Sequence, residues 1–329
     1  MAEASRVIDA AWLESGAHRH RFGAVRAMFR QLMRGGARAV RPVVGERTFE
    51  ALYALGRVGY LPRIDAPETF VEKLLWLRRY YRHPLMPQLA DKLELRSYVA
   101  KVAPECRTPE VFTVAESADA FDFNALPEHA VIKSTHASGH VAFWSPELDR
   151  QALRERMAGW LATHYDHRAN EWVYAHIRPR LFAEADLRDA EGRPPTDYKL
   201  LVFNGVVDHV QLVEGRGEDL YWRYFDRHWR QLPVFRSQQP GGSPSRPRGT
   251  RPEKPERFEA MVAAAERLAQ SFPFVRVDFY LHDDEMYVGE MTFFPSSGHP
   301  DYVPASFDRV LGARLVLPEA SSAYVRRET

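Results

Sequence analysis

The sequence of 329 residues is too long for one small hydrophobic core and suits either two packed subdomains or one large α/β domain. Its 45 Lys and Arg residues balance 44 Asp and Glu residues, so the net charge is +1 and the positive field typical of nonspecific nucleic-acid binding is absent. With 45% hydrophobic and 27% charged residues, the composition excludes a disordered or fibrous chain.

Cysteine use and hydropathy favour a cytoplasmic protein. Cys106 is the only cysteine in the sequence, which excludes an intrachain disulfide framework and a zinc site built from several thiolates. No apolar stretch reaches the roughly 18 residues that a membrane-spanning helix requires. The first residues lack the apolar core and small-residue cleavage site of a secretory signal, so we expect the chain to stay in the reducing cytoplasm.

The N-terminal residues have the strongest charge asymmetry, because eight arginines stand against three acidic residues within positions 1–45. Four apolar residues recur here at helical spacing beside a stripe of three arginines, which predicts a basic amphipathic helix. This helix either packs its apolar stripe on the protein itself or lies, through residues 19–41, on the anionic inner face of the membrane. The apolar residues are Phe22, Val25, Phe29 and Leu32, and the arginines are Arg26, Arg30 and Arg34.

The rest of the chain alternates between helical and strand periodicity. A helix from Pro67 to Tyr81 is ended by Pro84 and Pro87, and a second helix follows at Asp91–Val102. The later elements are a strand at Ala130–Ser134, a helix at Leu148–Tyr165, a strand at Arg180–Ala185, two strands within Asp197–Val213 around the Asn204-Gly205 turn, a helix at Pro255–Ser271, and strands at Phe274–Leu281 and Met286–Met291. The Pro-, Gly- and Arg-rich residues 237–255 predict a mobile surface loop.

The strand at 130–134 ends beside a candidate phosphate-binding turn. Lys133 is followed by the small and hydroxyl-bearing residues 134–140, which include Gly139. Closely spaced backbone N–H groups in such a turn, beside a fixed cation, bind phosphate oxygens and indicate a nucleotide ligand. The glycine spacing matches neither the P-loop nor the dinucleotide-binding fingerprint, which disfavours both classes. An ordinary strand-to-loop turn is the structural alternative.

The two strands after residue 273 place acidic and basic side chains on one face. Because side chains alternate along a strand, Arg276 and Asp278 share one face of the first strand, and Glu290 and Thr292 share one face of the next. If the strands pair as a hairpin, the two carboxylates approach each other, and their repulsion favours a hard cation such as Mg²⁺ between them. The alternative is a surface salt bridge between Arg276 and one acid.

Six short motifs follow one another along the chain: Asp91-Lys92, Val131-Ile132-Lys133, Phe182–Leu187, Asp197-Tyr198-Lys199, Arg276-Val277-Asp278 and Gly289–Thr292. In this order they resemble the motifs of ATP-grasp enzymes. Three longer segments, Asp197–Gly205, Phe225–Trp229 and Phe274–Tyr280, resemble more narrowly the TupA-like branch, which is associated with teichuronopeptide and other cell-surface polysaccharide clusters. The resemblance extends from about Pro67 to Leu317 and implies an α+β fold in which two α+β subdomains grip ATP between antiparallel sheets.

The resemblance divides the chain into three parts. We expect residues 1–88 to form a helical, basic N-terminal segment and residues 89–185 to form the lid and central subdomain. Residues 186–329 then form the core, with the metal-binding strands and the loop at 237–255.

The same resemblance implies the contacts with ATP. The residues that it places around the nucleotide are Lys92, Lys133 and Lys199 at the triphosphate, Ser134, Ser138, Gly139 and His140 in the turn that closes over it, Glu184 and Leu187 at the adenine, and Asp197 at the ribose.

By the same resemblance, Asp278 and Glu290 hold Mg²⁺, and Arg276 lies over the transferring phosphoryl group and the substrate carboxylate. At Thr292 the sequence departs from the Glu-x-Asn ending usual in the family. A hydroxyl is a shorter, neutral ligand, so we expect a second Mg²⁺ to be bound weakly or through water. The adjoining turn, which either contacts the acceptor or is a plain loop, consists of Ser296, Ser297 and Gly298.

The resemblance implies an ATP- and Mg²⁺-dependent ligase that joins a carboxylate to an amine through an acyl phosphate, with Arg276 and Lys133 as catalytic residues. The substrates would be small-molecule or saccharide carboxylates and amines of polysaccharide or related secondary-metabolite biosynthesis. A kinase with a hydroxyl acceptor, a glycosyltransferase and a non-catalytic nucleotide-binding protein are the alternatives. The intact set of Lys133, Asp278 and Glu290 disfavours the non-catalytic protein.

Overall fold

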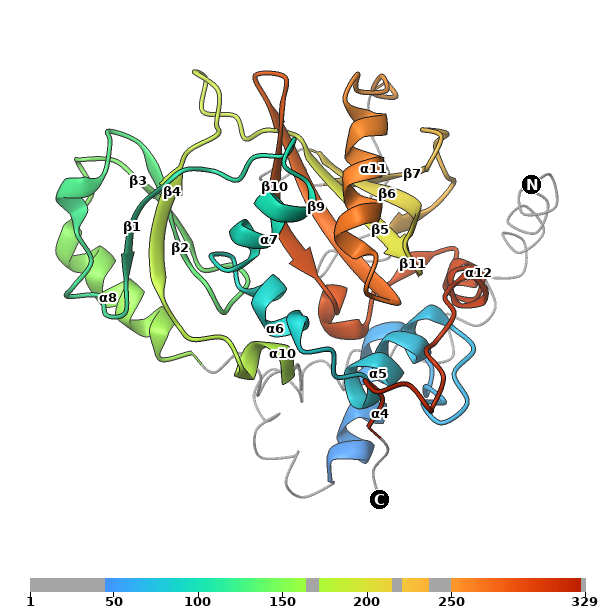
Figure 1. Ribbon diagram of the computed structural model, residues 1–329. Helices are drawn as coiled ribbons and strands as arrows, with labels where there is room; N and C mark the ends of the chain where they lie inside the picture. The colour runs from blue at the N-terminus through green and yellow to red at the C-terminus, as the bar shows by residue number, and fades with distance from the viewer. Residues whose placement is uncertain (1–44, 164–171, 215–220, 237–249, 327–329) are drawn as a thin grey trace.

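A computed structural model describes residues 45–163, 172–214, 221–236 and 250–326 of the chain. These residues form two large antiparallel sheets and one two-stranded sheet, with helices packed on the large sheets, which is the expected α+β class (Figure 1). The basic helix expected within residues 19–41 and most of the loop expected at 237–255 lie outside the described residues. No helix in the described part of the chain is long and apolar enough to cross a membrane.

The smaller sheet has four strands in the order β1-β4-β2-β3, and each neighbouring pair is antiparallel. Helix α8 (Arg150–Leu161) packs on this sheet and places Leu153, Met157 and Trp160 in one hydrophobic cluster with the strands. The helix begins after Asp149, whose carboxylate accepts hydrogen bonds from two backbone N–H groups of the first turn. The strands are β1 (Val111–Ala115), β2 (Ala130–Ser134), β3 (Val141–Trp144) and β4 (Leu181–Ala185), with the 3₁₀ turn η1 (Phe123–Ala125) between the first two.

The larger sheet has five antiparallel strands in the order β10-β9-β5-β6-β7. Its register places Leu200 opposite Val277 on the face covered by helix α11 (Phe258–Ala269), and Lys199 opposite Asp278 on the other face. One face is therefore apolar and packed, while the other carries polar side chains. The strands are β5 (Asp197–Phe203), β6 (Val206–Glu214), β7 (Tyr221–Asp226), β9 (Phe274–His282) and β10 (Glu285–Thr292), and the short strands β8 (Phe235–Arg236) and β11 (Tyr302–Val303) pair beside them.

The helix before the sheets is fastened to the C-terminal part of the chain. It begins with a capping box, in which the Thr69 hydroxyl accepts from the backbone N–H of Glu72 at 3.2 Å and the Glu72 carboxylate accepts from the Thr69 N–H at 3.0 Å. The Lys73 ammonium then donates to the carbonyls of Gly312 and Leu315 at 2.7 and 2.6 Å. These helices are α5 (Phe70–Tyr80) and α12 (Ser306–Arg314), and the others are α4 (Glu46–Val58), α6 (Leu85–Ala90), α7 (Leu95–Val102) and α10 (Trp172–Ala175).

The predicted strands and hairpins are confirmed, whereas two predictions between residues 84 and 95 need correction. Pro84 and Pro87, expected only to end a helix, lie before and within the first turn of α6, where proline needs no hydrogen-bond donor. The helix expected from Asp91 begins at Leu95, because the Asp91 carboxylate accepts from the N–H groups of the next residues and holds them in a turn.

Residues on both sides of position 89 contribute to one hydrophobic core. Leu89 of α6 and the buried Leu95 and Val99 of α7 belong to the cluster of the five-stranded sheet, not to that of the four-stranded sheet. In Figure 1, α6 and α7 accordingly lie between the two sheets. The division at residues 88 and 185 stays a prediction.

The contact between α5 and α12 predicts a stability effect at Gly312. A Cβ atom at this position would lie 2.1 Å from the backbone oxygen of Glu68, so Gly312→Ala must force the two helices apart. We expect a loss of about 1–3 kcal/mol in the free energy of unfolding, measured by urea denaturation. The control is Gly159→Ala in α8, where nothing lies within 4 Å of the added carbon, and where we expect no loss or a gain of up to about 1 kcal/mol. Equal effects of the two substitutions would contradict the close contact.

Candidate active site

A row of polar side chains crosses the open face of the five-stranded sheet. The register places Tyr224 opposite Gln211, Gln211 opposite Lys199, Lys199 opposite Asp278, and Asp278 opposite Glu290. Since side chains in register on neighbouring strands project from the same face, residues far apart in sequence become direct neighbours. The expected hairpin that brings the two carboxylates together is confirmed.

Asp278 is the centre of this row and is 1% exposed. Arg276 binds it with two hydrogen bonds, from Nε to Oδ1 at 2.6 Å and from Nη2 to Oδ2 at 2.7 Å. The Lys199 ammonium donates to Oδ2 at 2.5 Å and also to Asp197 at 3.0 Å, and Arg276 donates further to the Thr292 hydroxyl at 3.0 Å. A buried carboxylate requires such partners, so the ion pair is internal and not a surface salt bridge.

The two carboxyl groups of the hairpin have opposite pKa shifts. Burial raises the pKa of Asp278 above its ordinary value, while Arg276 and Lys199 act against this effect. Burial also acts to raise the pKa of Glu290, but the positive charges of Lys92, Arg276 and Lys199 outweigh it and the pKa is lowered. Glu290 is therefore held as a carboxylate at neutral pH.

A bulge sets the position of Glu290 on its strand. The register of β10 against β9 shifts between Val288 and Glu290, at Gly289. A Cβ atom on Gly289 would lie 2.4 Å from the Tyr280 ring, so a larger residue at this position would have to displace that ring. Sequence reasoning did not identify the bulge, although a glycine inside a strand is its usual signal.

The predicted metal ligands agree with Mg²⁺ in donor type but are already occupied by protein cations. Asp278, Glu290 and Thr292 offer only oxygen donors, and the two carboxylates lie opposite each other. No group of three or more His, Cys, Asp or Glu side chains within the described ranges is arranged as a metal site. Because Arg276 and Lys199 hold both oxygens of Asp278, a metal ion there would compete with these two contacts.

A second ionic centre lies on the four-stranded sheet. The Lys133 ammonium of β2 donates to one oxygen of Glu184 on β4, and Arg96 of α7 donates to the other. The structure thus brings together Lys133, predicted at the triphosphate, and Glu184, predicted at the adenine, and both Glu184 oxygens are bound to cations. Arg96 was missed, because nothing in the helical pattern marks it as facing a strand. Leu187 follows β4 and is half-buried.

The turn after β2 is organised by side-chain contacts. The Ser134 hydroxyl is hydrogen-bonded to Nδ1 of His140 at 2.9 Å, and the His140 ring stacks on Trp160 of α8, with centroids 5.4 Å apart. Gly139 has a φ of 79° and would have nothing within 4 Å of a Cβ atom, so the tip of the turn is open to a ligand. Ser138 lines the cavity described below.

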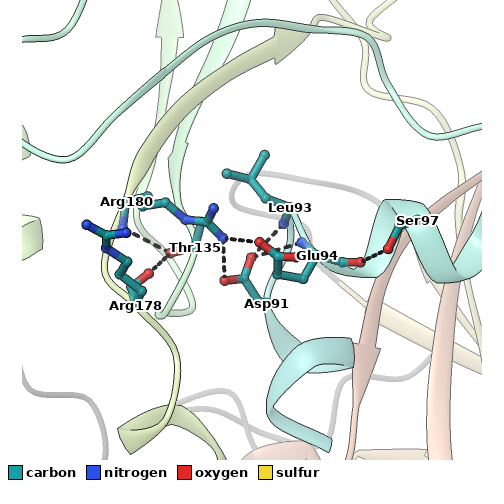
Figure 2. A network of polar contacts seen from close by, with 7 residues as sticks. All are labelled: Asp91, Leu93, Glu94, Ser97, Thr135, Arg178 and Arg180. Atoms are coloured by element: carbon teal, nitrogen blue, oxygen red, sulfur yellow. Dashed lines mark hydrogen bonds and ion pairs between the residues drawn. The ribbon is translucent and has the colours of Figure 1, made fainter. Parts of the chain in front are cut away.

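A polar network joins this turn to the region before α7 (Figure 2). The Asp91 carboxylate binds Arg180 at 3.0 Å, and the backbone of Arg180 is hydrogen-bonded to Thr135 through both the main chain and the hydroxyl. Next to it, the Lys92 ammonium donates to the Ala137 carbonyl at 3.0 Å. The turn before α7 therefore places Lys92 against the predicted phosphate-binding turn.

A cavity of about 390 Å³ opens on the polar face of the five-stranded sheet. Among the predicted site residues, those that line it are Ser138, Lys199, Arg276, Glu290, Thr292, Ser296 and Ser297. The lining residues that sequence reasoning missed include Tyr174, Gln211, Trp222, Tyr224, Arg236 and Tyr302. Alternation along β6 and β7 was the signal for three of these, because Gln211, Trp222 and Tyr224 share the face of Lys199.

The predicted substrate turn, η2 (Pro295–Gly298), is held in place by hydrogen bonds to its backbone. Ser296 and Ser297 have φ values of 52° and 57°, in the left-handed region that residues other than glycine seldom adopt. Arg78, buried in an ion pair with Glu50, donates to the Ser297 carbonyl at 2.7 Å, and Nδ1 of His299 donates to the same oxygen at 2.8 Å. The N-terminal helices therefore support the wall of the cavity.

Comparisons with known proteins identify the family of the sequence. The sequence model described as TupA-like ATPgrasp matches residues 72–316, more than half of the chain. No curated protein sequence matches.

Solved structures with similarity to this chain include two D-alanine–D-alanine ligases and a RimK domain protein. The ligase from Bacillus anthracis, complexed with ATP, is 14% identical over 63% of this chain and 55% of its own, with a TM-score of 0.37. The ligase from Helicobacter pylori is 13% identical over 70% and 61%, with a TM-score of 0.36. The RimK domain ATP-grasp protein from Sphaerobacter thermophilus is 16% identical over 68% and 65%, with a TM-score of 0.36. This chain spans less than two thirds of the length of each of them.

The environment of His299 predicts a pH-dependent stability. Burial, assisted by the charge of Arg78, lowers the pKa of His299 to about 3. Below the ordinary histidine pKa, the unfolded chain binds a proton that the folded protein does not. The free energy of unfolding therefore decreases as the pH decreases, by about 1.4 kcal/mol per pH unit, until the pH approaches the pKa of His299 in the folded protein. From pH 7 to pH 5, urea denaturation should show a loss about 2 kcal/mol larger for the natural protein than for His299→Asn, which keeps an N–H donor for Ser297 but does not titrate. Equal losses in the two proteins would contradict a neutral, buried His299.

Proposed function

Since the chain belongs to the TupA-like ATP-grasp family, we propose that it is an ATP- and Mg²⁺-dependent ligase that joins a carboxylate to an amine through an acyl phosphate. One observation carries the proposal: Arg276, Lys199, Asp278 and Glu290 meet on one wall of a cavity. Such a set of fixed charges suits a reaction in which the protein mainly positions reactants and stabilises transferring charge.

The proposed phosphate contacts come from both sheets. Lys133 of the four-stranded sheet and Lys199 of the five-stranded sheet bind the triphosphate, and Lys92 approaches it beside the turn 134–140. In support, Lys92 already contacts that turn, and its charge acts on the pKa of Glu290 in the opposite sheet. The phosphate chain would therefore lie between the two ionic centres.

The proposed adenosine contacts flank the segment between the sheets. Leu187 contacts the adenine, Asp197 accepts from the ribose hydroxyls, and Glu184 accepts from the adenine amino group. Because Lys133 and Arg96 bind both Glu184 oxygens, one of these cations must turn away before the carboxylate can accept from adenine. The phosphates offer Lys133 an alternative partner, which supports the assignment.

Asp278 and Glu290, with Thr292 as a neutral third oxygen, are the proposed holders of Mg²⁺. When bound, the ion neutralises charge on the phosphate oxygens during transfer. Release of Lys199 from Asp278 would free a carboxylate oxygen for the metal and an ammonium for the phosphates. The same contact thus orients both groups until the ligand arrives.

The proposed chemistry needs no side-chain nucleophile. A substrate carboxylate oxygen attacks the γ-phosphorus, the bond to the bridging oxygen breaks, and ADP leaves. The amine nitrogen then attacks the acyl carbon and loses a proton, phosphate leaves with its oxygen, and an amide remains. Arg276 stabilises the charge on the transferring phosphoryl group and orients the carboxylate, and the turn of Ser296, Ser297 and Gly298 contacts the acceptor.

The proposed cellular role is the biosynthesis of cell-surface polysaccharide or a related secondary metabolite, on the cytoplasmic side of the membrane. It rests on the family to which the chain belongs. The basic residues 19–41 would hold the enzyme near anionic lipid, each arginine adding about 1 kcal/mol near the surface.

Lys133→Ala should weaken MgATP binding about ten- to more than a hundredfold, because a charge-assisted contact of about 1.5–3 kcal/mol is lost. The fold should remain intact, since Arg96 still balances Glu184. Calorimetric titration with a slowly hydrolysed ATP analogue measures the affinity of the natural protein and that of Lys133→Ala. Lys101→Ala, which removes an exposed lysine of α7, is the charge-matched control and should bind as the natural protein does. Unchanged binding in Lys133→Ala would remove this lysine from the nucleotide site.

Hydroxylamine trapping tests the ligase chemistry itself, because hydroxylamine converts an acyl phosphate into a hydroxamate and leaves a phosphate ester unchanged. With ATP, Mg²⁺ and a panel of uronic and amino acids, we expect hydroxamate in step with ADP for at least one carboxylate. Arg276→Ala and Glu290→Gln should each lower the rate at least about a hundredfold. The control Glu259→Gln, which changes an exposed acid of α11, should leave the rate unchanged. ADP formed together with a phosphorylated sugar hydroxyl, without hydroxamate, would favour the kinase.

A further inference from the structure

The cavity extends past the residues assigned to phosphoryl transfer. From Lys199 its floor continues across β6 and β7 to Gln211 and Tyr224, and Arg236 of β8 and Tyr302 of β11 line it beside them. None of these four additional residues has a part in the proposed transfer reaction. They lie toward the β7 edge of the sheet, whereas Glu290 lies on β10 at the other edge.

Arg236 is held in a defined orientation. Its strand pairs with β11 so that Arg236 lies opposite Tyr302. The guanidinium carbon lies 4.7 Å from the centroid of the Trp222 ring, and Nη2 donates to the Ser296 hydroxyl at 2.8 Å. Stacking and one hydrogen bond fix the guanidinium plane but use only one of its five N–H groups.

Arg236 is one of three basic residues that line the cavity. The other two basic residues of the cavity, Arg276 and Lys199, are both bound to Asp278. Asp301 also lines the cavity, and its charge and that of Arg236 act in opposite directions on the pKa of Tyr224. The planar fork of this half-buried guanidinium matches a carboxylate or a phosphate.

The neighbouring side chains indicate what carries that anionic group. Trp222, Tyr224 and Tyr302 offer rigid rings with polar tips, and Gln211 offers an amide that donates and accepts. Such a lining suits a molecule with apolar ring faces and many hydroxyls, which is the chemistry of a sugar.

We propose that Arg236, positioned by Trp222 and Ser296, binds a second anionic group of the carboxylate substrate, either a carboxylate or a phosphate, and that this substrate is therefore a sugar acid with two anionic groups. This inference rests on the proposed function, because it assigns the reacting carboxylate to Arg276 and leaves the second anion for Arg236. Arg276 and Arg236 together would select carboxylate substrates that carry both anionic groups.

Equilibrium binding to pairs of sugar acids tests the subsite without turnover. Gluconate and glucarate differ in a second carboxylate, and glucuronate and glucuronate 1-phosphate differ in a phosphate. Calorimetry with Mg²⁺ and a slowly hydrolysed ATP analogue should show that the natural protein binds at least one dianionic member about tenfold or more tightly than its partner. The pair that shows this preference distinguishes a carboxylate from a phosphate as the second anion.

Arg236→Gln should reduce that preference to about twofold or less while the affinity for the monoanionic member and the ATP analogue stays within about twofold. Arg236→Lys keeps the charge without the planar fork and should give an intermediate preference, which also provides a result if Arg236→Gln does not fold. The charge-matched control is Arg257→Gln, at an arginine that pairs with Asp284 outside the cavity, and it should keep the full preference.

The outcomes separate this subsite from the ligase reaction. No preference for either dianionic member in the natural protein, or a preference that survives Arg236→Gln, would overturn the subsite. A natural protein that shows the Arg236-dependent preference but forms no hydroxamate with these acids keeps the subsite and overturns the ligase. Hydroxamate formation without the Arg236-dependent preference keeps the ligase and overturns the subsite.

Discussion

The arrangement of the charged side chains in the cavity depends on how the buried carboxylate of Asp278 is neutralised. Asp278 is enclosed between a bidentate arginine and a lysine, and the three residues come from two strands whose register is set by the apolar face against α11. A buried ion pair of this kind contributes little net stability, because desolvation offsets the attraction. Removal of one partner is costly, however, so the pairing strongly specifies which charges stand at this place in the sheet. Glu290 and Thr292 then take their positions relative to it.

The two ionic centres belong to different sheets and are connected by a short segment. Lys133, Glu184 and Arg96 form the centre on the four-stranded sheet, although Arg96 comes from α7, which packs in the core of the other sheet. The network around Asp91 and Arg180 makes a second connection of the same kind (Figure 2). Any change in the angle between the sheets must therefore alter contacts with charged groups, which a bound triphosphate would also contact in the proposed reaction.

The cavity wall depends on parts of the chain that are far apart. Arg78 and Glu50 of the N-terminal helices hold the strained turn η2, and Ser296 of this turn orients Arg236. The strain at Ser296 and Ser297 persists because buried hydrogen bonds on the far side of the turn oppose its relaxation. The helices before residue 89 thus shape the part of the cavity that we assign to the substrates.

The sequence by itself determined the local elements and the types of the charged residues. Alternation predicted the hairpins at 197–213 and 274–291, and it placed Arg276 with Asp278 and Glu290 with Thr292, because a two-residue period follows directly from strand geometry. The order of the motifs indicated the ATP-grasp fold, which the family match confirms. The assigned roles of the individual site residues stay proposals.

Tertiary structure decided which of these residues meet. The bulge at Gly289, the contact of Arg96 with Glu184, and the approach of Arg236 to Trp222 and Ser296 all join segments separated in sequence. Periodicity assigns a side chain to a face, but it carries no information on strand order, on the register between distant strands, or on the helix that covers a sheet. These depend on the packing of the whole core, and so the cavity and the place of Arg236 in it emerge only once the chain is folded.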